Sequence, residues 1–101
     1  MYDIITFGSA TQDIFVNPGK LKIIDSKDDF ITGKGICFGL GSKVNVEQMF
    51  FSSGGGGTNT VTTFAKQGFR VAFCGAVGED IAGKEIIEEL KHFKINTGLI
   101  L

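Results

Sequence analysis

The pattern of apolar and polar positions divides the chain into three parts. Residues 3–8 form an apolar run that ends in glycine, which is typical of a buried strand in a parallel sheet. Residues 14–52 contain short β-type pieces, separated by charged, turn-rich spacers, at 14–16, 21–24 and 43–51. In the last of these pieces Val44 and Val46 fall on one face, so this part predicts antiparallel, partly exposed strands.

The second half of the chain has helical and strand periodicities in alternation. A helix is predicted over residues 58–66 with Gly68 at its C-cap position, followed by a strand over 69–74. Asp80 is a plausible N-cap for a second helix that ends near residue 93, and a further strand starts at Thr97. The buried stripe of the second helix is expected at Ile86, Ile87, Leu90 and Phe93. The order strand, β insertion, helix, strand, helix, strand predicts a doubly wound α/β sheet.

Composition and charge exclude several classes of protein. The chain has 101 residues and a formal net charge of −1, so it lacks the basic surface expected of a nucleic-acid-binding protein. No apolar run reaches the roughly 18 residues of a membrane span, and the first residues do not resemble a signal peptide. Cys37 and Cys74 lack metal-type spacing and are interpreted as two buried free thiols in a reducing cytoplasm.

Two features could carry chemistry. Four glycines at 54–57 join an apolar run to the first predicted helix, where glycine lets a ligand approach the backbone and a helix start offers unpaired N–H groups. Asp13 lies just past the end of the first strand, at the sheet edge where α/β proteins bind ligands, and a carboxylate there suits a sugar diol. Asn59 could bind another hydroxyl. The structural alternatives are a flexible linker for the glycines, a turn or cap role for Asp13 and an N-cap role for Asn59.

These residues resemble the first signature of the ribokinase-like (PfkB-type) carbohydrate and nucleoside kinases. Residues 8–13, GSATQD, are similar to the family's strand-end motif, whose aspartate binds substrate hydroxyls. Residues 55–59, GGGTN, resemble its glycine-rich part, and residues 78–83, GEDIAG, match its glycine-acid-acid turn. The resemblance extends over nearly the whole chain, from about residue 2 to residue 101.

The resemblance implies a three-layer α/β/α fold with an inserted small β lid, of which this chain is the N-terminal portion. Residues 14–52 would form the lid, and residues 1–13 and 53–101 the α/β core. The implied function is the substrate-binding and lid portion of an ATP-dependent kinase that phosphorylates a sugar or nucleoside hydroxyl. The implied substrate-binding residues are Thr11, Asp13, Gly55, Gly56 and Asn59.

The resemblance also implies that the catalytic and nucleotide-binding residues of the enzyme lie outside this chain. The family's catalytic base, nucleotide pocket and magnesium-linked acidic residues lie in a C-terminal half, and no residue here matches them, so ATP and Mg²⁺ are implied for the full-length enzyme alone. Ribokinases proper carry a lysine where this chain has Gly56, and Val61 replaces a small residue. A homodimer formed through the lid and a cytoplasmic location are further expectations.

Three alternatives concern the nature of the chain. It ends on the apolar run 99–101, from which we expect a fragment whose isolated form is marginally stable or aggregates, although a short docked terminal strand is possible. The chain could instead be a non-catalytic sugar-binding or dimerisation module. A dinucleotide-binding unit fits poorly, because the glycine run follows a long β insertion instead of the first strand.

Overall fold

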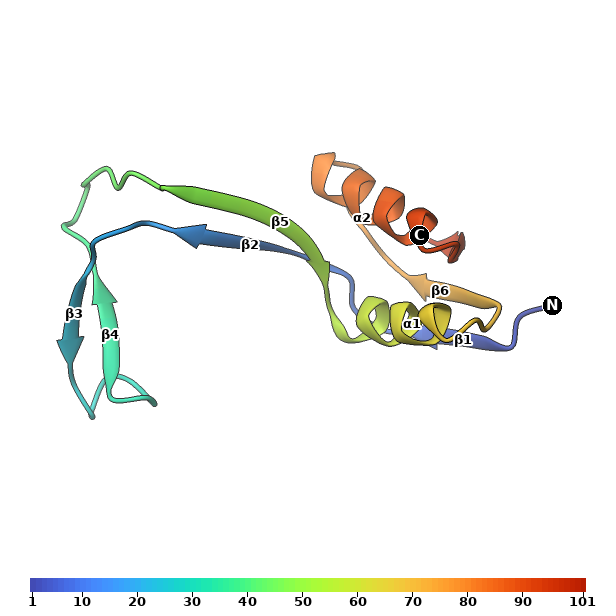
Figure 1. The fold of residues 1–101 in the computed structure, drawn as a ribbon, viewed down its shortest axis with the longest axis horizontal. Coiled ribbons are helices and arrows are strands. Elements are labelled where there is room, and N and C mark those ends of the chain that lie inside the picture. Colours follow the sequence, from blue (N-terminus) through green and yellow to red (C-terminus); the bar gives the residue numbers. More distant parts are fainter. The chain divides into compact units, whose positions relative to one another are not determined.

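The computed structural model describes residues 1–101, which form seven strands and two helices (Figure 1). The strands are β1 (Ile4–Phe7), β2 (Thr11–Asn17), β3 (Lys22–Asp25), β4 (Lys34–Cys37), β5 (Gln48–Gly54), β6 (Val71–Gly75) and β7 (Asn96–Ile100). The helices are α1 (Gly56–Lys66) and α2 (Ile81–His92). Two compact units result: Met1–Ile14 with Phe51–Leu101, and Phe15–Phe50.

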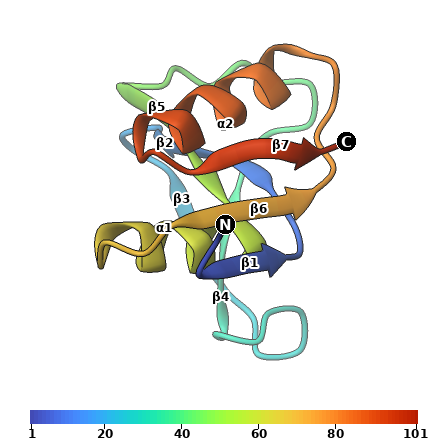
Figure 2. The same cartoon turned by 90° about the vertical axis from the view of Figure 1, so that its right-hand side faces the viewer.

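A parallel sheet of order β1-β6-β7 forms the centre of the first unit (Figure 2). Ile4 pairs with Val71 and Phe7 with Cys74, and Cys74 in turn pairs with Leu99. The predicted alternation of parallel strands and helices after a β insertion is therefore confirmed.

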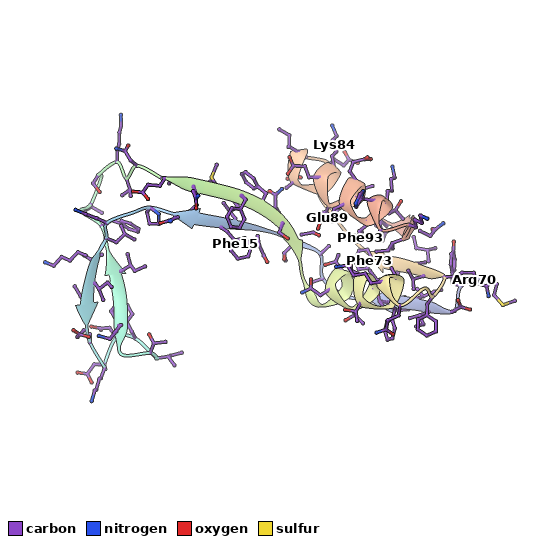
Figure 3. All side chains as sticks on the ribbon, viewed as in Figure 1. Phe15, Arg70, Phe73, Lys84, Glu89 and Phe93 are labelled. Atoms are coloured by element: carbon purple, nitrogen blue, oxygen red, sulfur yellow. The ribbon has the colours of Figure 1, made fainter.

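Both helices contribute to one hydrophobic core. The buried residues come from α1, β6, α2 and the residue before β7: Val61, Val71, Phe73, Ile86, Leu90 and Ile95. Phe73 is the largest fully buried side chain, and Figure 3 shows it between the helices and the sheet. Of the stripe predicted for α2, Ile86 and Leu90 are buried, whereas Ile87 and Phe93 are half-buried.

The start of α2 is held by its own side-chain cap. Asp80 is the N-cap, as predicted, and its carboxylate accepts a hydrogen bond of 2.8 Å from the Gly83 N–H. A Cβ atom at Gly83 would collide with the Gly78 carbonyl oxygen. The turn at 78–83 therefore has a structural role, because its glycines permit close packing and its aspartate caps the helix.

Both helices end in a left-handed residue. Gly68 has φ +90° and directly follows the C-cap of α1, which is Gln67 and so lies one residue earlier than the predicted Gly68. The corresponding residue after α2 is Lys94, with φ 59°. Lys94 is the one residue other than glycine with positive φ, in a conformation that costs a side-chain-bearing residue about 1 kcal/mol.

An ion pair links the amino ends of β1 and β6. The Arg70 guanidinium lies 3.0 Å from the Asp3 carboxylate, which also accepts a hydrogen bond of 2.8 Å from the Arg70 backbone N–H. Hydrogen bonding to Arg70 lowers the pKa of Asp3 below its ordinary value of 3.8. Arg70 is labelled at this end of the sheet in Figure 3.

The second unit is built of strands, and here several sequence expectations are wrong. β3 and β4 pair antiparallel, with Ile23 opposite Ile36, although no strand was predicted over 34–37. Residues 43–47 are not a strand, and β5 starts only at Gln48. β2 pairs with β5, and the Phe15 and Phe50 rings stack with their centroids 5.5 Å apart.

The cysteine prediction is corrected in part. Cys37 and Cys74 are free, but Cys37 is exposed and Cys74 is half-buried, so the expectation of two buried thiols is wrong. Cys74 alternates along β6 with the core residue Phe73, so its side chain lies on the other face of the sheet. Neither helix is long and apolar enough to cross a membrane.

Candidate functional site

The loop after β1 meets the start of α1 at Ser9. The Ser9 hydroxyl accepts a hydrogen bond of 3.0 Å from the Gly56 N–H, and its carbonyl accepts from the N–H groups of Gly57 and Thr58 at 3.1 and 3.4 Å. These are N–H groups that a helix start leaves without an intrahelical partner. The expectation that they face a ligand is therefore wrong for these three residues, because Ser9 caps the helix.

Ser9 is a residue whose role the sequence reasoning missed. The motif at 8–13 contains Ser9, but the motif itself assigns this residue no role. Serine is a preferred capping residue, but capping patterns are read from the residue just before a helix. Ser9 precedes α1 by 47 positions, so no local pattern could have revealed it.

Two buried threonines fix the glycine loop at 54–57 through hydrogen bonds to its backbone carbonyls. The Thr6 hydroxyl donates to the Gly57 carbonyl at 3.0 Å, and the Thr58 hydroxyl donates to the Gly54 carbonyl. Both side chains are almost fully buried. The backbone of the glycine run is thus held at both ends, which contradicts the alternative of a flexible linker.

Two of the four glycines, Gly55 and Gly57, are required by their surroundings, and Gly54 lies against the ends of two exposed side chains. A Cβ atom at Gly57 would lie 2.6 Å from the Phe73 ring and 2.9 Å from the Gly8 backbone. Gly55 has φ +99°, and a Cβ atom there would lie 2.5 Å from the Ser9 carbonyl oxygen. At Gly54 a Cβ atom would lie 2.5 Å from the Asp13 carboxylate and 3.0 Å from the Thr11 hydroxyl.

Gly56 differs from its neighbours. No protein atom lies within 4 Å of a Cβ atom placed there, its φ is not positive, and the residue is exposed. Nothing inside the first unit therefore requires glycine at this position, which leaves space for a ligand to approach the backbone.

Thr11 and Asp13 form the polar part of the site. They lie at the start of β2, and both reach the backbone of Gly54. The Thr11 hydroxyl donates a hydrogen bond of 3.4 Å to the Asp13 carboxylate, and both residues are exposed. A carboxylate and a hydroxyl side by side offer acceptors and a donor to a polyhydroxylated ligand.

Asn59 lies in the first turn of α1, and its side chain is exposed. Its backbone N–H donates to the Gly55 carbonyl, and its carbonyl accepts from the Thr63 hydroxyl. Asn59 is therefore part of the helix, whose N-cap is Gly55, so the alternative of Asn59 as N-cap is wrong. The structure brings Thr11, Asp13, Gly54 and Gly55 together around one loop, and Asn59 follows on the helix that starts there.

The chain has no group of three or more histidine, cysteine, aspartate or glutamate side chains that could hold a metal ion. The groups that the site offers to a ligand are the Thr11 hydroxyl, the Asp13 carboxylate and the Asn59 amide, near the exposed backbone of Gly56.

Comparison with known proteins identifies the family. The family model for pfkB family carbohydrate kinases matches residues 20–100, and the chain therefore belongs to this family. No curated protein matches the chain.

Solved structures share the fold. A PfkB protein from Polaromonas sp. JS666 matches with a TM-score of 0.69 and 20% identity over 100% of this chain and 27% of its own. A ribokinase from Arabidopsis thaliana, solved with ribose and ATP, matches with a TM-score of 0.68 and 24% identity over 95% of this chain and 26% of its own. A nucleoside kinase from Methanocaldococcus jannaschii matches with a TM-score of 0.65 and 20% identity over 99% of this chain and 28% of its own. The chain thus spans about a quarter of the length of these structures.

Proposed function

We propose that this chain is the substrate-binding and lid portion of an ATP-dependent kinase that phosphorylates a hydroxyl group of a sugar or nucleoside. The observation that carries the proposal is the cluster at Gly54, where Thr11 and Asp13 meet the glycine loop beyond the end of β1. Family membership supports it, as do solved relatives that include a ribokinase bound to ribose and a nucleoside kinase.

Each residue has a distinct task in this proposal. Asp13 accepts hydrogen bonds from two neighbouring hydroxyls of the substrate, and Thr11 orients that carboxylate. Asn59 binds a further hydroxyl, while Gly55 and Gly56 let the ring approach the loop backbone. Residues 14–52 form the lid, which excludes water from the site of phosphoryl transfer.

The nucleotide, Mg²⁺ and the catalytic base belong to other parts of the enzyme in this proposal. No step involving Mg²⁺ is assigned to the residues of this chain, which brings no three histidine, cysteine, aspartate or glutamate side chains together in a way that suits a metal ion. We place the protein in the cytoplasm, where free cysteines such as Cys37 stay reduced.

The test is kinase activity in a protein of family length that begins with this chain, assayed as ATP consumption over a panel of sugars and nucleosides. Asp13→Asn removes the charge of the carboxylate and replaces one acceptor oxygen by an amide donor, so kcat/KM should fall about 100-fold. The matched control is Asp28→Asn, another exposed aspartate, which should retain activity. Turnover that is absent with every substrate, or unaffected by Asp13→Asn, would overturn the proposal.

The exposed apolar side chains of the second unit favour a homodimer formed through the lid. Phe15 and Phe50 stack on each other, yet each remains about half exposed, at 49% and 61%. Phe15→Ser should then shift the protein from dimer to monomer in light scattering coupled to size exclusion. An unchanged mass would exclude this surface, and sugar binding in a dimer without turnover would favour the alternative of a non-catalytic module.

A further inference from the structure

Two glutamates of α2 hold the strands that carry the candidate site. The Ser53 backbone N–H, in β5, donates a hydrogen bond of 3.0 Å to the Glu89 carboxylate. The Gln12 side-chain amide, in β2, donates to the Glu85 carboxylate. Glu85 and Glu89 are four residues apart and so lie on the same side of the helix. In Figure 3 Glu89 lies on the side of α2 that faces the end of β5.

Both contacts lie one residue away from the proposed substrate cluster. Gln12 directly precedes Asp13, and Ser53 directly precedes Gly54. Gly54 and Asp13 are themselves in contact, because a Cβ atom at Gly54 would lie 2.5 Å from the Asp13 carboxylate. All six residues belong to the first compact unit. The helix therefore holds both strands at the point where they approach each other.

The two hydrogen bonds differ in strength. The bond between Ser53 and Glu89 joins a backbone N–H to a carboxylate between two half-buried residues, and charge-assisted bonds of this kind are stronger than neutral ones. The bond between Gln12 and Glu85 is exposed to solvent, which weakens it. Glu89 is consequently the main contact and Glu85 the secondary one.

We propose that Glu85 and Glu89 are positioning residues that set the placement of Asp13 relative to Gly54 and thereby the affinity for the sugar or nucleoside. This inference rests on the proposed function for its effect on binding, whereas its structural part stands on the contacts alone. Each glutamate acts through the residue that directly precedes a site residue, so in this proposal it positions the site and does not bind the ligand itself.

Nuclear magnetic resonance of a protein of family length that begins with this chain tests the structural part without any ligand. In Glu89→Ala the Ser53 amide should exchange with solvent about tenfold faster or more, because it loses a hydrogen bond to a charged group. The resonances of the Gly54 amide and the Asp13 carboxyl carbon should shift in the same variant. Glu89→Gln keeps an acceptor oxygen and should restore part of the protection. Gln12→Ala and Glu85→Gln should each give smaller shifts, and their combination no more than either alone.

The matched control is Glu88→Ala on the same helix. Glu88 pairs with Lys91 of the same helix at 3.3 Å and not with a residue of β2 or β5. This variant should leave the Ser53 exchange rate and the Asp13 resonance unchanged. Equal effects of Glu88→Ala and Glu89→Ala, or no effect of Glu89→Ala, would overturn the inference.

Titration of the same family-length protein with D-ribose and with adenosine tests the effect on binding. If the wild-type protein binds either probe, Glu89→Ala should raise its Kd by about three- to tenfold while Glu88→Ala does not, and equal affinities would overturn the positioning role. If neither probe binds the wild-type protein, the proposed function loses its support, whereas the exchange and shift measurements still decide whether Glu85 and Glu89 position the cluster.

Discussion

Replacing Gly56 and Gly57 separately by alanine would distinguish a glycine kept for a ligand from one kept for packing. In Gly56→Ala the new methyl group meets no protein atom within 4 Å, and alanine is favoured over glycine in a helix by about 0.5–1 kcal/mol. In Gly57→Ala the methyl group would lie 2.6 Å from the Phe73 ring and 2.9 Å from the Gly8 backbone. Phe73 is fully buried, so it has no room to move, and overpacking of this kind costs about 1–3 kcal/mol.

Thermal unfolding followed by circular dichroism measures this contrast. For a domain of about 100 residues, 1 kcal/mol corresponds to roughly 4–8 °C, so Gly56→Ala should leave Tm unchanged or raise it by a few degrees. Gly57→Ala should lower Tm. If the substrate approaches Gly56 as proposed, the same Gly56→Ala variant should lose about tenfold in sugar affinity, equivalent to about 1.4 kcal/mol. If Gly56→Ala binds sugar as tightly as wild type, the proposed role of Gly56 in substrate approach is refuted. If Gly56→Ala has a lower Tm than wild type, the conclusion that the space around Gly56 is open is refuted.

Four further predictions concern stability. Asp80→Ala should lower the free energy of unfolding by about 1 kcal/mol through loss of the α2 cap, and Asp80→Asn should retain most of it, as measured by urea denaturation. Lys94→Gly should raise that free energy by up to about 1 kcal/mol, since glycine adopts φ 59° without strain, whereas Lys94→Ala should not. Because Arg70 lowers the pKa of Asp3 below 3.8, the ion pair stabilises the folded state above pH 3.8, and this stabilisation is lost as the pH falls through the lowered pKa. The Tm difference between wild type and Asp3→Asn should therefore be constant from roughly pH 5 to 8 and shrink in acid. The isolated chain should self-associate in sedimentation velocity, and Phe7→Ser should reduce this; a monomer with sharp, reversible unfolding would contradict it.

The prediction of self-association comes from the face of the sheet that the helices do not cover. Phe7, Cys74 and Leu99 stand side by side by register, so they share one face, and Phe7 is 75% exposed. The core residues Val71 and Phe73 alternate with Cys74 and pack toward the helices on the other face. Such an apolar row is expected of a sheet with a helical layer on each face, the architecture predicted for the family.

The regular elements of the first unit could be predicted because their signals are local. Helix α2 has an aspartate at its start and buried residues at Ile86 and Leu90, which is a complete pattern within a dozen positions. The strands of the second unit depend on partners elsewhere in the chain. Lys34–Cys37 contains a glycine and few β-formers, and it is a strand because β3 pairs with it. Conversely, the alternation around Val44 and Val46 was wrong as a strand prediction, because alternation alone does not supply a partner.

The candidate site shows the same division between local and distant causes. The sequence presents the four glycines at 54–57 alike, but the neighbours of three of them come from residues far away in sequence: Asp13 for Gly54, Ser9 for Gly55 and Phe73 for Gly57. Ser9 likewise accepts hydrogen bonds from the helix N–H groups that the sequence analysis assigns to a ligand. Gly56 is the position where no such neighbour requires glycine, so that a ligand outside the chain can decide the residue. Substrate choice in the proposed enzyme should therefore respond most to changes at Gly56 and Asp13, and fold stability to changes at Gly55 and Gly57.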